Sequence, residues 1–384
     1  MKKIISFALT VVLAMGCLTG CGGNASENAG DTFKIGGSGP LTGGAAAYGD
    51  AVNKGAQIAV EEINAAGGIN GYMIEFKMAD DEHDAEKGVN AYNSLKDWGM
   101  QIMMGTVTSA PCIAVEAEAS ADNMFLITPS GTAVDCISGS NAFRLCFSDP
   151  AQGTKSAEYI GVNKLATKVA IIYDSSDPYS SGICESFKAE AANQGITVVA
   201  SEAFTADSKT DFKVQLQKAK DSGAELLFLP IYYQEASLIL QQANDIGFKP
   251  LIFGCDGLDG ILGVENFDVS LAEGVMLLTP FAADAQDDLT KNFVAKYAEK
   301  FNGEVPMQFA ADAYDAIYAI KAAIEKSGAT PDMSASDLCN AMSGAMTEIS
   351  LTGLTGTITW DASGEPNKEP KAVIIENGAY KAMD

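Results

Sequence analysis

Short, continuously apolar runs separated by amphipathic stretches constrain the fold of this 384-residue chain more than any other feature. A continuously apolar run is typical of a strand that helices cover on both faces, as in a parallel sheet, whereas a half-exposed strand alternates apolar and polar residues. The runs predict strands at 33–36, 74–78, 101–104, 125–128 and 143–145, and a second series at 169–173, 197–200, 226–229, 251–253 and 275–278.

The stretches between these runs have the spacing of helices. In 48–65, Val52, Ile58 and Ile63 recur at roughly helical intervals among polar residues, which predicts one buried stripe. Similar patterns cover 85–97, 180–194 and 235–246. Alternating strands and helices predict right-handed βαβ crossovers and doubly wound layers. Because ten strands are too many for one ordinary sheet, we expect two doubly wound α/β lobes of roughly 120 residues each.

The chain is predicted to cross between the lobes at three places. A strand ends and a proline starts the next helix at Ser148-Asp149-Pro150, and Thr279-Pro280-Phe281 marks a second crossing. Two long helices follow, at 287–302 and 308–326, and the run LTGLTGTITW at 351–360 predicts a β-hairpin that returns to the second lobe. We therefore expect a hinge of three segments between an N-terminal lobe, 33–149 plus 280–350, and a C-terminal lobe, 150–279 plus 351–384.

The first twenty residues have the pattern of an export signal. Lys2 and Lys3 form a basic start, and the apolar run over 4–18 is shorter than a membrane-spanning helix. We expect a signal peptide at 1–20, followed by a small, polar and flexible tether at 21–32.

The end of this signal resembles the bacterial lipobox. It reads Leu18-Thr19-Gly20-Cys21, which makes Cys21 the predicted site of lipidation, and Cys17 fits the pattern less well. The alternative is an ordinary secretory signal with an incidental cysteine. A diacyl anchor would hold the exported protein at the outer face of the cell membrane without spanning it.

Charge and histidine content exclude several classes of protein. The formal net charge is −25, and removal of 1–20, which carries two lysines and no acid, makes it −27. So acidic a surface repels phosphate backbones, which excludes nucleic acid as a partner. One histidine in the chain removes most histidine-dependent catalysis and histidine-built metal sites. The composition therefore favours a binding protein that carries no cofactor or metal over an enzyme.

Motifs of catalysis are weak in this chain. The run GSGPLTG at 37–43 departs from the spacing of a dinucleotide loop, and Pro40 lacks the backbone N–H that a phosphate would need. His83, in the acidic run 80–84, is interpreted as part of a solvated loop in which Asp84 caps the next helix. A carboxylate pair of an extracytoplasmic enzyme stays open as an alternative, because no pair stands out.

Six cysteines follow Cys21, and none belongs to a CxxC pair, which argues against zinc and thioredoxin-like sites. Cys136 and Cys146 flank a short turn and could close a small loop in an oxidising compartment. The alternative, six buried thiols, is equally compatible with the sequence.

Small hydroxyl residues and tyrosines follow the predicted strands, where α/β folds bind their ligands. The run LTGGAAAYGDAVNKGAQIAVEEINAAGGING at 41–71, GTVTS at 105–109, TPSGT at 128–132 and LPIYYQE at 229–235 resemble the branched-chain amino acid ABC transporter substrate-binding proteins. These have the type I periplasmic-binding-protein fold, and the similarity extends over 33–384.

The resemblance implies an amino-acid site. Ser109 and Thr132 match hydroxyls that hold the ligand carboxylate, together with backbone N–H groups of Ser109 and Ala110, since Pro111 has none. Donors at a helix N-terminus replace the water that a buried carboxylate loses. The other matching positions are Ser130, whose carbonyl accepts from the ammonium group, the tyrosines Tyr48, Tyr179 and Tyr232, and Asp256, which pairs with the ammonium group.

Each of these residues also has a structural interpretation. Ser109 and Thr132 could cap helices, one of the adjacent Tyr232 and Tyr233 is expected to pack in the core, and Asp256 could be a turn residue. Phe281, near the hinge, is expected to contribute to the side-chain pocket.

The resemblance further implies a mechanism and partners. A free amino acid docks on the first lobe, hinge closure brings the second lobe over it, and the closed complex delivers it to an ABC transporter permease. We expect a monomer attached to the membrane by its lipid. Relatives within the fold bind amides, urea or aromatic acids, and Asp256, as a partner for an ammonium group, argues against these alternatives.

Overall fold

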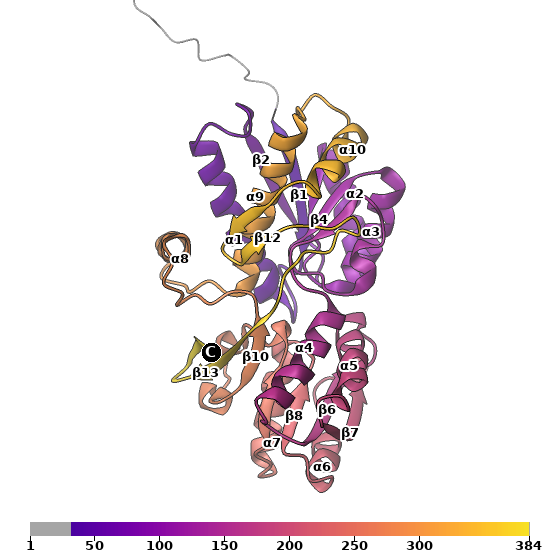
Figure 1. The fold of residues 1–384 in the computed structure, drawn as a ribbon, viewed down its shortest axis with the longest axis vertical. Coiled ribbons are helices and arrows are strands. Elements are labelled where there is room, and N and C mark those ends of the chain that lie inside the picture. Colours follow the sequence, from indigo (N-terminus) through magenta and orange to yellow (C-terminus); the bar gives the residue numbers. More distant parts are fainter. Residues whose placement is uncertain (1–31, 384) are drawn as a thin grey trace, which may run out of the picture. The chain divides into compact units, whose positions relative to one another are not determined.

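Two sheets, each formed mainly of parallel strands, organise the computed structural model, which describes residues 32–383 (Figure 1). The first sheet has the order β2-β1-β3-β4-β5, and all of its strands are parallel. Its strands are β1 (Phe33–Gly39), β2 (Ile74–Asp80), β3 (Ile102–Met104), β4 (Phe125–Thr128) and β5 (Ala142–Arg144). All five were predicted from the apolar runs, and this confirms the first parallel sheet.

Helices cover both faces of this sheet. One face packs against α1, α9 and α10, and the other packs against α2 and α3. Neighbouring residues of one strand point to opposite faces, so Phe125 and Leu126 of β4 belong to different hydrophobic clusters. These helices are α1 (Ala46–Ala65), α2 (Ala85–Trp98), α3 (Ser109–Asp122), α9 (Gln308–Ser327) and α10 (Ala335–Met346). We call this sheet and its helices the first lobe.

The second sheet has seven strands in the order β14-β13-β10-β9-β8-β6-β7. The strands β6 to β10 run parallel, and the C-terminal pair β13 and β14 adds two antiparallel strands at one edge. Their bounds are β6 (Lys168–Asp174), β7 (Thr197–Phe204), β8 (Leu226–Leu229), β9 (Leu251–Gly254), β10 (Met276–Thr279), β13 (Lys371–Glu376) and β14 (Ala379–Ala382). The five parallel strands were predicted, and the terminal pair was not.

Helices again cover the two faces of the second sheet, with α4 and α5 on one and α6 and α7 on the other. They are α4 (Asp149–Val162), α5 (Pro178–Ala191), α6 (Lys213–Asp221) and α7 (Tyr233–Asp245). We call this sheet and its helices the second lobe. The remaining helix α8 (Asp288–Lys300) contacts α1, and Lys296 and Lys300 form ion pairs with Glu62 and Glu61 there.

Local signals fix the helix ends that shape the cleft. The Asp84 carboxylate accepts a hydrogen bond from Lys87 N at 2.9 Å, which confirms the predicted N-cap of α2. Asp177 caps α5 in the same way, with Tyr179 N at 3.1 Å and Pro178 at the first helical position.

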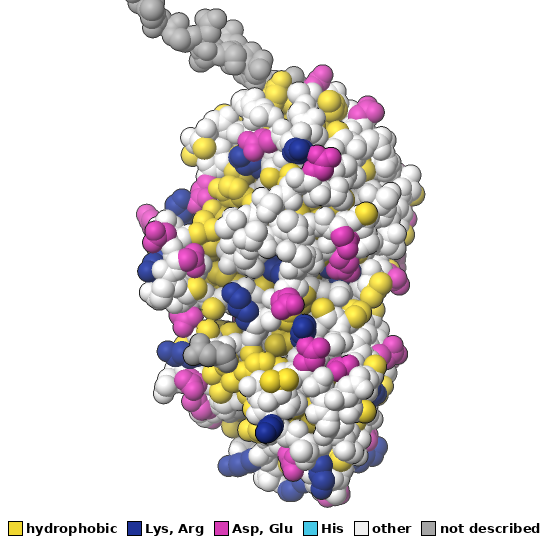
Figure 2. Space-filling view, in the orientation of Figure 1, with side chains coloured by type: hydrophobic (Ala, Val, Ile, Leu, Met, Phe, Trp, Pro, Cys, Tyr) yellow, Lys and Arg dark blue, Asp and Glu magenta, His cyan; other side chains and the backbone are white. Residues whose placement is uncertain are grey.

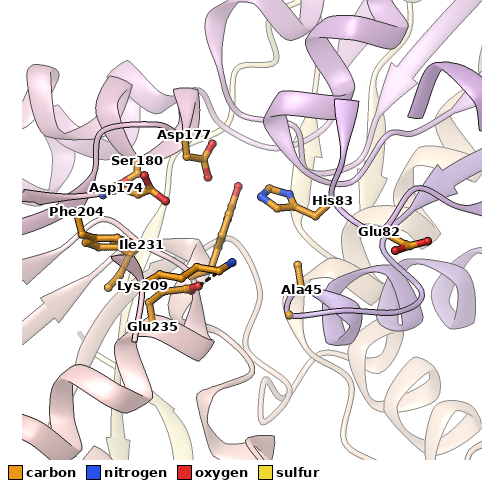
Figure 3. Close-up of a pocket in the computed structure, with 12 residues that line it drawn as sticks. Ala45, Glu82, His83, Asp174, Asp177, Ser180, Phe204, Lys209, Ile231 and Glu235 are labelled. Carbon is orange, nitrogen blue, oxygen red and sulfur yellow. Dashed lines mark hydrogen bonds and ion pairs between the residues drawn. The ribbon is translucent and has the colours of Figure 1, made fainter. Parts of the chain in front are cut away.

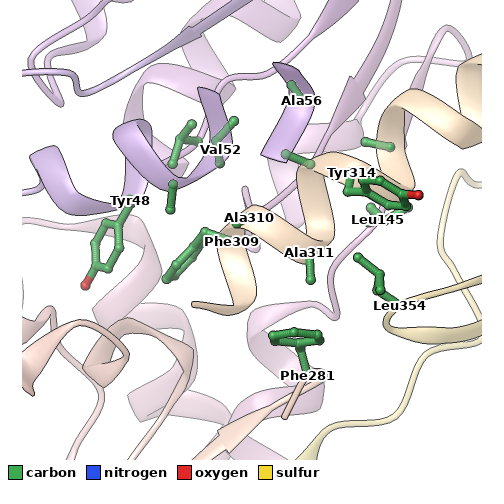
Figure 4. Packing of buried hydrophobic residues seen from close by; sticks show 14 of the residues in the cluster. Tyr48, Val52, Ala56, Leu145, Phe281, Phe309, Ala310, Ala311, Tyr314 and Leu354 are labelled. Atoms are coloured by element: carbon green, nitrogen blue, oxygen red, sulfur yellow. The ribbon is translucent and has the colours of Figure 1, made fainter. Parts of the chain in front are cut away.

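Close packing of α1 on α9 depends on Gly55. A Cβ atom at this glycine would lie 2.0 Å from the carbonyl oxygen of Ala310, so only glycine allows the two helices to approach this far. Val52 and Ala56 of α1 then pack against this part of α9 (Figure 4). This contact fixes the positions of Tyr48 and Phe309 at the cleft ends of the two helices.

The third crossing runs beside the first. Trp360 Nε1 donates to Arg144 O at 2.7 Å, and Lys368 Nζ donates to Leu145 O at 3.1 Å and pairs with Asp312 Oδ1 at 2.8 Å. Both groups of the Lys368–Asp312 pair are almost fully buried, with side-chain exposures of 3% and 2%. The hinge segments are therefore tied to one another and to α9.

One predicted lobe assignment is wrong. The hairpin of β11 (Leu351–Gly353) and β12 (Gly356–Ile358) was assigned to the second lobe, within 351–384, but it packs on α9 of the first lobe. Asp315 of α9 accepts hydrogen bonds from the N–H groups of Leu354 and Thr355, both at 2.9 Å, and this anchors the turn. The chain returns to the second lobe only at β13.

The cysteines of the described chain are free and buried. Cys136 and Cys146 do not form a disulfide, and Cys136 instead lies against Cys112, whose Sγ is 3.9 Å from the carbonyl oxygen of Cys136. The predicted signal peptide, tether and lipidation site Cys21 lie outside the described residues. Within 32–383, no helix combines the length and apolar character needed to cross a membrane, and no group of three or more metal-ligating side chains occurs.

Acidic side chains occur on both lobes in the view of Figure 2. On the face shown in Figure 2, acidic and basic side chains are interspersed over both lobes. Many of the ion pairs are exposed, such as Lys87–Glu82 and Lys326–Glu348, and such pairs contribute little to stability. On this face, the negative charge is therefore not gathered into one acidic patch.

Candidate ligand-binding site between the lobes

A small cavity lies where the two lobes meet. It is lined by Tyr48, Val107, Thr108, Ser109, Ser130, Thr132 and Phe309 of the first lobe and by Tyr179, Tyr232, Asp256 and Gly257 of the second. Seven of the eight residues expected from the sequence to bind a ligand lie in this lining. The eighth, Ala110, is the second residue of α3 and follows Ser109 directly. Among the predicted residues, the structure thus brings together positions as far apart in the sequence as Tyr48 and Asp256.

The carboxyl ends of the parallel strands place these residues. Ser109 begins α3 after β3, and Ser130 and Thr132 follow β4. In the second lobe, Tyr179 lies in the first turn of α5 after β6, Tyr232 precedes α7 after β8, and Asp256 follows β9. Ligands of open α/β sheets bind outside the carboxyl ends of the strands, so the location is the one expected for a binding site.

Among Ser109, Ser130 and Thr132 of the first lobe, two hydroxyl groups already have protein partners. Ser109 Oγ accepts a hydrogen bond from Ala133 N at 3.2 Å, and Ser130 Oγ donates to Val107 O at 2.7 Å. These bonds join the loop after β3 to the loop after β4. The third hydroxyl, Thr132 Oγ1, is buried and has no hydrogen-bond partner among the described residues. A buried polar atom without a partner is costly, and the carboxyl group of Asp149, whose pKa burial raises and the Thr132 hydroxyl lowers, lies close to it.

The N-terminus of α3 points into the same end of the cavity. The first N–H groups of a helix have no partner within the helix, and they carry partial positive charge. In α3 these groups belong to Ser109 and Ala110, whereas Pro111 has no N–H and Cys112 N donates to Thr108 O at 3.1 Å. Together with the hydroxyls of Ser109 and Thr132, this end of the cavity suits a carboxylate.

Asp256 supplies a negative group at the second-lobe side. Its side chain is 4% exposed, and Tyr179 Oη donates to Asp256 Oδ1 at 2.7 Å. Burial raises the pKa of Asp256 to about 7, although the hydrogen bonds of Tyr179 and Gln152 oppose this shift. The buried cationic groups of Arg144 and Lys368 pair with Glu365 and Asp312 instead. The carboxylate of Asp256 therefore lacks a cationic partner within the described chain.

Aromatic rings form the remaining walls. Tyr232 stacks on Tyr179 with ring centroids 4.8 Å apart and an interplanar angle of 9°, and its edge meets Tyr48 at 5.6 Å. Phe309 lies 4.5 Å from Tyr48, centroid to centroid. The neighbouring Tyr233 belongs to the core, where its hydroxyl accepts from Ala47 N at 3.3 Å. This confirms that one of the two adjacent tyrosines packs, and the other, Tyr232, lines the cavity.

Tyr48 connects the two lobes directly. Its hydroxyl donates to Gly257 O at 2.5 Å and accepts from Tyr233 N at 3.2 Å, and both partners belong to the second lobe. Gln308, the first residue of α9, adds a second link, because its Nε2 donates to Asp256 O at 3.0 Å. The described conformation therefore has the lobes in contact around the cavity, which corresponds to a closed form.

Two polar residues next to the cavity were not predicted from the sequence. Asp149, the first residue of α4, is 1% exposed, and its Oδ1 has no hydrogen-bond partner among the described residues. Burial raises the pKa of Asp149, and the charge of Asp256 adds to this effect. One turn later, Gln152 Oε1 accepts from Asp256 N at 3.1 Å. Asp149 lies at the predicted first crossing, and its position there could have indicated a role near the cleft.

His83 and Phe309 also approach the cleft without having been assigned to it. His83 Nδ1 lies 2.8 Å from Thr108 Oγ1, and its ring meets the ring of Tyr232 of the second lobe at 5.3 Å. His83 lies in the predicted loop, but its side chain is partly buried against the second lobe and not fully solvated. Phe281, expected in the side-chain pocket, lies outside the cavity lining and packs on Phe293 at 6.2 Å, while Phe309 lines the cavity (Figure 4).

Comparison with known proteins places this architecture in a family. The model of the family described as periplasmic binding protein matches residues 32–373. The chain belongs to the periplasmic binding protein family. This binding protein is 34% identical to Leu/Ile/Val-binding protein homolog 3 of Brucella melitensis over 332 residues, which cover 85% of this chain and 86% of the relative.

Solved structures agree with this assignment. The branched-chain amino acid transporter substrate-binding protein LivJ from Streptococcus pneumoniae, in complex with isoleucine, superposes with a TM-score of 0.83 at 30% identity and covers 91% of this chain and 98% of its own. The leucine-binding protein LivK from Thermotoga maritima reaches a TM-score of 0.82 at 27% identity, with coverages of 92% and 98%. The predicted type I periplasmic-binding-protein fold is thereby confirmed.

Family membership also bears on the enzyme alternative and on location. Periplasmic binding proteins bind solutes and are not enzymes, so the carboxylate pair of an extracytoplasmic enzyme is not supported. Membership further implies that this binding protein works outside the cytoplasm.

Proposed function

We propose that this binding protein captures a branched-chain or similar aliphatic amino acid in the interlobe cavity and delivers it to the membrane permease of an ABC transporter. The relatives named above are Leu/Ile/Val-binding and leucine-binding proteins, and one of the related structures contains isoleucine. The observation that carries the proposal is the buried carboxyl group of Asp256, which lines the cavity without a cationic partner among residues 32–383.

The two ends of the cavity suit the two charged groups of an amino acid. The carboxylate accepts hydrogen bonds from the N–H groups of Ser109 and Ala110 and from the Ser109 and Thr132 hydroxyls. The ammonium group pairs with Asp256 and donates to the carbonyl oxygen of Ser130. Each buried charge then has charged or hydrogen-bonding partners, which offsets the desolvation that both charges undergo.

The apolar part of the lining then receives the ligand side chain. Val107, Phe309 and the rings of Tyr48, Tyr179 and Tyr232 offer no charge to that side chain. Burial of each methylene contributes about 0.8 kcal/mol, so aliphatic side chains of increasing size gain affinity until they fill the space. This pattern supports leucine, isoleucine and valine over acidic or basic amino acids.

Closure of the lobes supplies the mechanism of capture. A ligand that first docks on Ser109, Ser130 and Thr132 contacts one lobe only, and closure adds the contacts of Tyr179, Tyr232 and Asp256. These added contacts stabilise the closed form relative to the open form, and a ligand shifts such an equilibrium only through this difference. The Tyr48 hydroxyl bonds across the lobes are part of the same closed form.

Attachment to the membrane is a separate part of the proposal. Lipidation of Cys21 would keep a monomeric binding protein close to its permease, and the lipobox-like run before Cys21 supports this. Mass spectrometry of the protein purified from membranes tests the anchor, and we expect a diacylglyceryl group on Cys21. A mature chain that begins elsewhere without lipid would contradict the anchor and leave the ligand proposal intact.

A ligand panel tests the function. Thermal unfolding of the protein is measured with leucine, isoleucine, valine, lysine, glutamate, an amide, urea and benzoate, and calorimetry then gives the dissociation constants. A ligand at 100 times its dissociation constant stabilises the folded state by about 2.7 kcal/mol. We expect leucine, isoleucine or valine to give the largest shifts. A shift with benzoate or an amide, and none with aliphatic amino acids, would refute the proposal.

A further inference from the structure

A second cavity adjoins the proposed amino-acid cavity, and Tyr232 lines both of them. We call it the outer chamber. Its charged and titratable lining comprises Glu82 and His83 of the first lobe and Asp174, Asp177, Lys209 and Glu235 of the second (Figure 3). The two cavities therefore share one aromatic residue, with Tyr48 and Tyr179 beside it in the inner lining and His83 beside it in the outer one.

The outer chamber differs chemically from the inner cavity. Four of its lining residues are acidic. Glu82 pairs with Lys87 at 2.6 Å and Glu235 with Lys209 at 3.5 Å, whereas Asp174 and Asp177 form no ion pair within the described chain. Asp177 is 8% exposed, and its Oδ1 accepts from Tyr179 N at 3.1 Å. Burial raises the pKa of Asp177 to about 6, and the hydrogen bond from Tyr179 N opposes this shift. A chamber with this balance of charges favours a cationic group, whereas Val107 and Phe309 make part of the inner cavity apolar.

Rings from both lobes hold Tyr232 in place between the cavities. Tyr179 stacks on one face at 4.8 Å, and the rings of Tyr48 and His83 meet it edge to face at 5.6 and 5.3 Å. Tyr48 and His83 belong to the first lobe, and Tyr179 and Tyr232 to the second. The ring therefore has little freedom to move aside while the lobes are closed.

We propose that Tyr232 is a specificity-determining partition that separates the apolar amino-acid cavity from the acidic outer chamber and so excludes ligands with long, cationic side chains. This inference rests on the proposed function, because it concerns which amino acids the same site accepts. With the ring present, the ammonium group of a lysine side chain would end against apolar walls without a partner. Without the ring, the same group could reach the chamber carboxylates.

The ligand pair that tests this is lysine and norleucine. Norleucine has an unbranched aliphatic side chain that lacks the terminal amino group of lysine, so the ratio of their dissociation constants isolates that group. In the wild-type protein we expect norleucine to bind at least ~100-fold more tightly than lysine, since an unpaired buried charge is strongly disfavoured. In Tyr232→Ser we expect this ratio to fall at least ~10-fold, as lysine gains and norleucine loses affinity.

The substitution is chosen to preserve the fold. Tyr232 occupies the N-cap position of α7 with an extended backbone, φ −83° and ψ 161°, and serine is a favoured N-cap residue. Tyr232→Ala is the second variant, which shows whether the effect depends on the serine hydroxyl. The melting temperature without ligand reports on folding in each case. Tyr232→Phe is the matched control that keeps the ring, and we expect its norleucine-to-lysine ratio to stay within ~3-fold of wild type.

A double variant tests whether the chamber receives the side chain. Asp177→Asn keeps an oxygen that can accept from Tyr179 N and removes one chamber charge. In Tyr232→Ser/Asp177→Asn we expect lysine to bind ~5- to 10-fold more weakly than in Tyr232→Ser, with norleucine within ~2-fold, because a partly buried charge pair is lost.

The outcomes separate this inference from the proposed function. An unchanged ratio in Tyr232→Ser and Tyr232→Ala, an equal fall in Tyr232→Phe, or no effect of Asp177→Asn on lysine would each overturn the partition. A wild-type protein that binds neither leucine nor norleucine would refute the proposed function, and the partition with it. Normal norleucine binding with an unchanged ratio refutes the partition alone.

Discussion

Replacement of Asp256 by asparagine should move ligand affinity and ligand-free stability in opposite directions. Asparagine has nearly the same shape, and its carbonyl oxygen can still accept the hydrogen bond from Tyr179 Oη, which is 2.7 Å long in the wild-type protein. The substitution removes only the charge. In the proposed complex this leaves the ligand ammonium group buried without its counter-charge.

The expected loss of affinity follows from the burial of this site. Removal of one partner of a buried ion pair costs about 3–5 kcal/mol, and each 1.4 kcal/mol is a factor of ten. Because Asp256 is 4% exposed, solvent screens the interaction little, and we expect leucine to bind roughly 10²- to 10³-fold more weakly, or worse.

The ligand-free protein should respond in the opposite sense. The pKa of Asp256 is raised to about 7 from its ordinary value of 3.8, mainly by burial, so the folded protein holds this proton more tightly than the unfolded chain does. Its contribution to stability is then complete below about pH 4 and is lost as the pH rises to about 7. At 1.36 kcal/mol per pKa unit, the loss is on the order of 4 kcal/mol. Asp256→Asn removes this penalty, so the variant should gain more stability at pH 8 than at pH 5.

Calorimetry with leucine and urea unfolding at the two pH values measure both effects. Asp315→Asn is the matched control, because Asp315 is equally buried but binds the turn at Leu354 and Thr355 instead of lining the cavity. This control should lose stability and keep its leucine affinity within ~3-fold, since the substitution weakens charge-assisted hydrogen bonds of the turn only. A leucine affinity of Asp256→Asn within ~3-fold of wild type would refute the role of this carboxylate.

Two further predictions concern closure of the lobes. Tyr48→Phe removes the hydrogen bonds to Gly257 O and Tyr233 N but keeps the ring. Loss of these bonds should destabilise the closed form by about 1–2 kcal/mol, so we expect leucine to dissociate ~5- to 30-fold faster in stopped-flow measurements. An unchanged dissociation rate would contradict the role of Tyr48 in closure. Burial, and then the charge of Lys209, lower the pKa of His83 in the closed form, and the nearby acids Glu235, Asp174 and Asp84 oppose this shift. Because the closed form binds this proton less tightly than an open form in which the ring is exposed, protonation of His83 favours opening. Leucine affinity should therefore fall as the pH drops below ~6.5, and it should fall less in His83→Asn. Asparagine is chosen because it tolerates the positive φ of 60° at this position. Equal pH profiles of the two proteins would show that His83 does not contribute.

The strands of both sheets could be predicted because the burial of a strand is reflected in its own apolar residues. Most of the ten predicted strands are short apolar runs, and such a run records that helices cover both faces of the strand. The strand β2, IEFKMAD, alternates apolar and polar residues instead and lies at a sheet edge. Of the two terminal strands, β14 lies at the sheet edge and is mostly exposed, whereas β13 carries a continuous apolar run at 372–375 that was not assigned to a strand. The hairpin at 351–358 was recognised but assigned to the wrong lobe, because its anchor, Asp315 of α9, is 36 residues or more away in the sequence.

The site shows the same limit. Ser109, Thr132 and Asp256 were identified because they follow strands in motifs of a recognisable family, and the structure brings them to one cavity. His83 lies in a run of acidic residues that resembles a solvated loop, and its ring is partly buried against Thr108 and against Tyr232 of the other lobe. Phe309 likewise reads as one more apolar residue of an amphipathic helix. Contacts made across the cleft leave no trace in local sequence patterns.

The two ends of the described chain belong to different lobes. β1 begins at Phe33 in the first lobe, and β14 ends at Ala382 in the second. A mechanical load applied between these ends is consequently carried by the three hinge segments and the cross-lobe bonds of Tyr48, not by either sheet alone. Fluorophores or force handles placed at the ends would therefore follow opening of the cleft without any substitution inside it, and a bound ligand would raise the tension at which the lobes part.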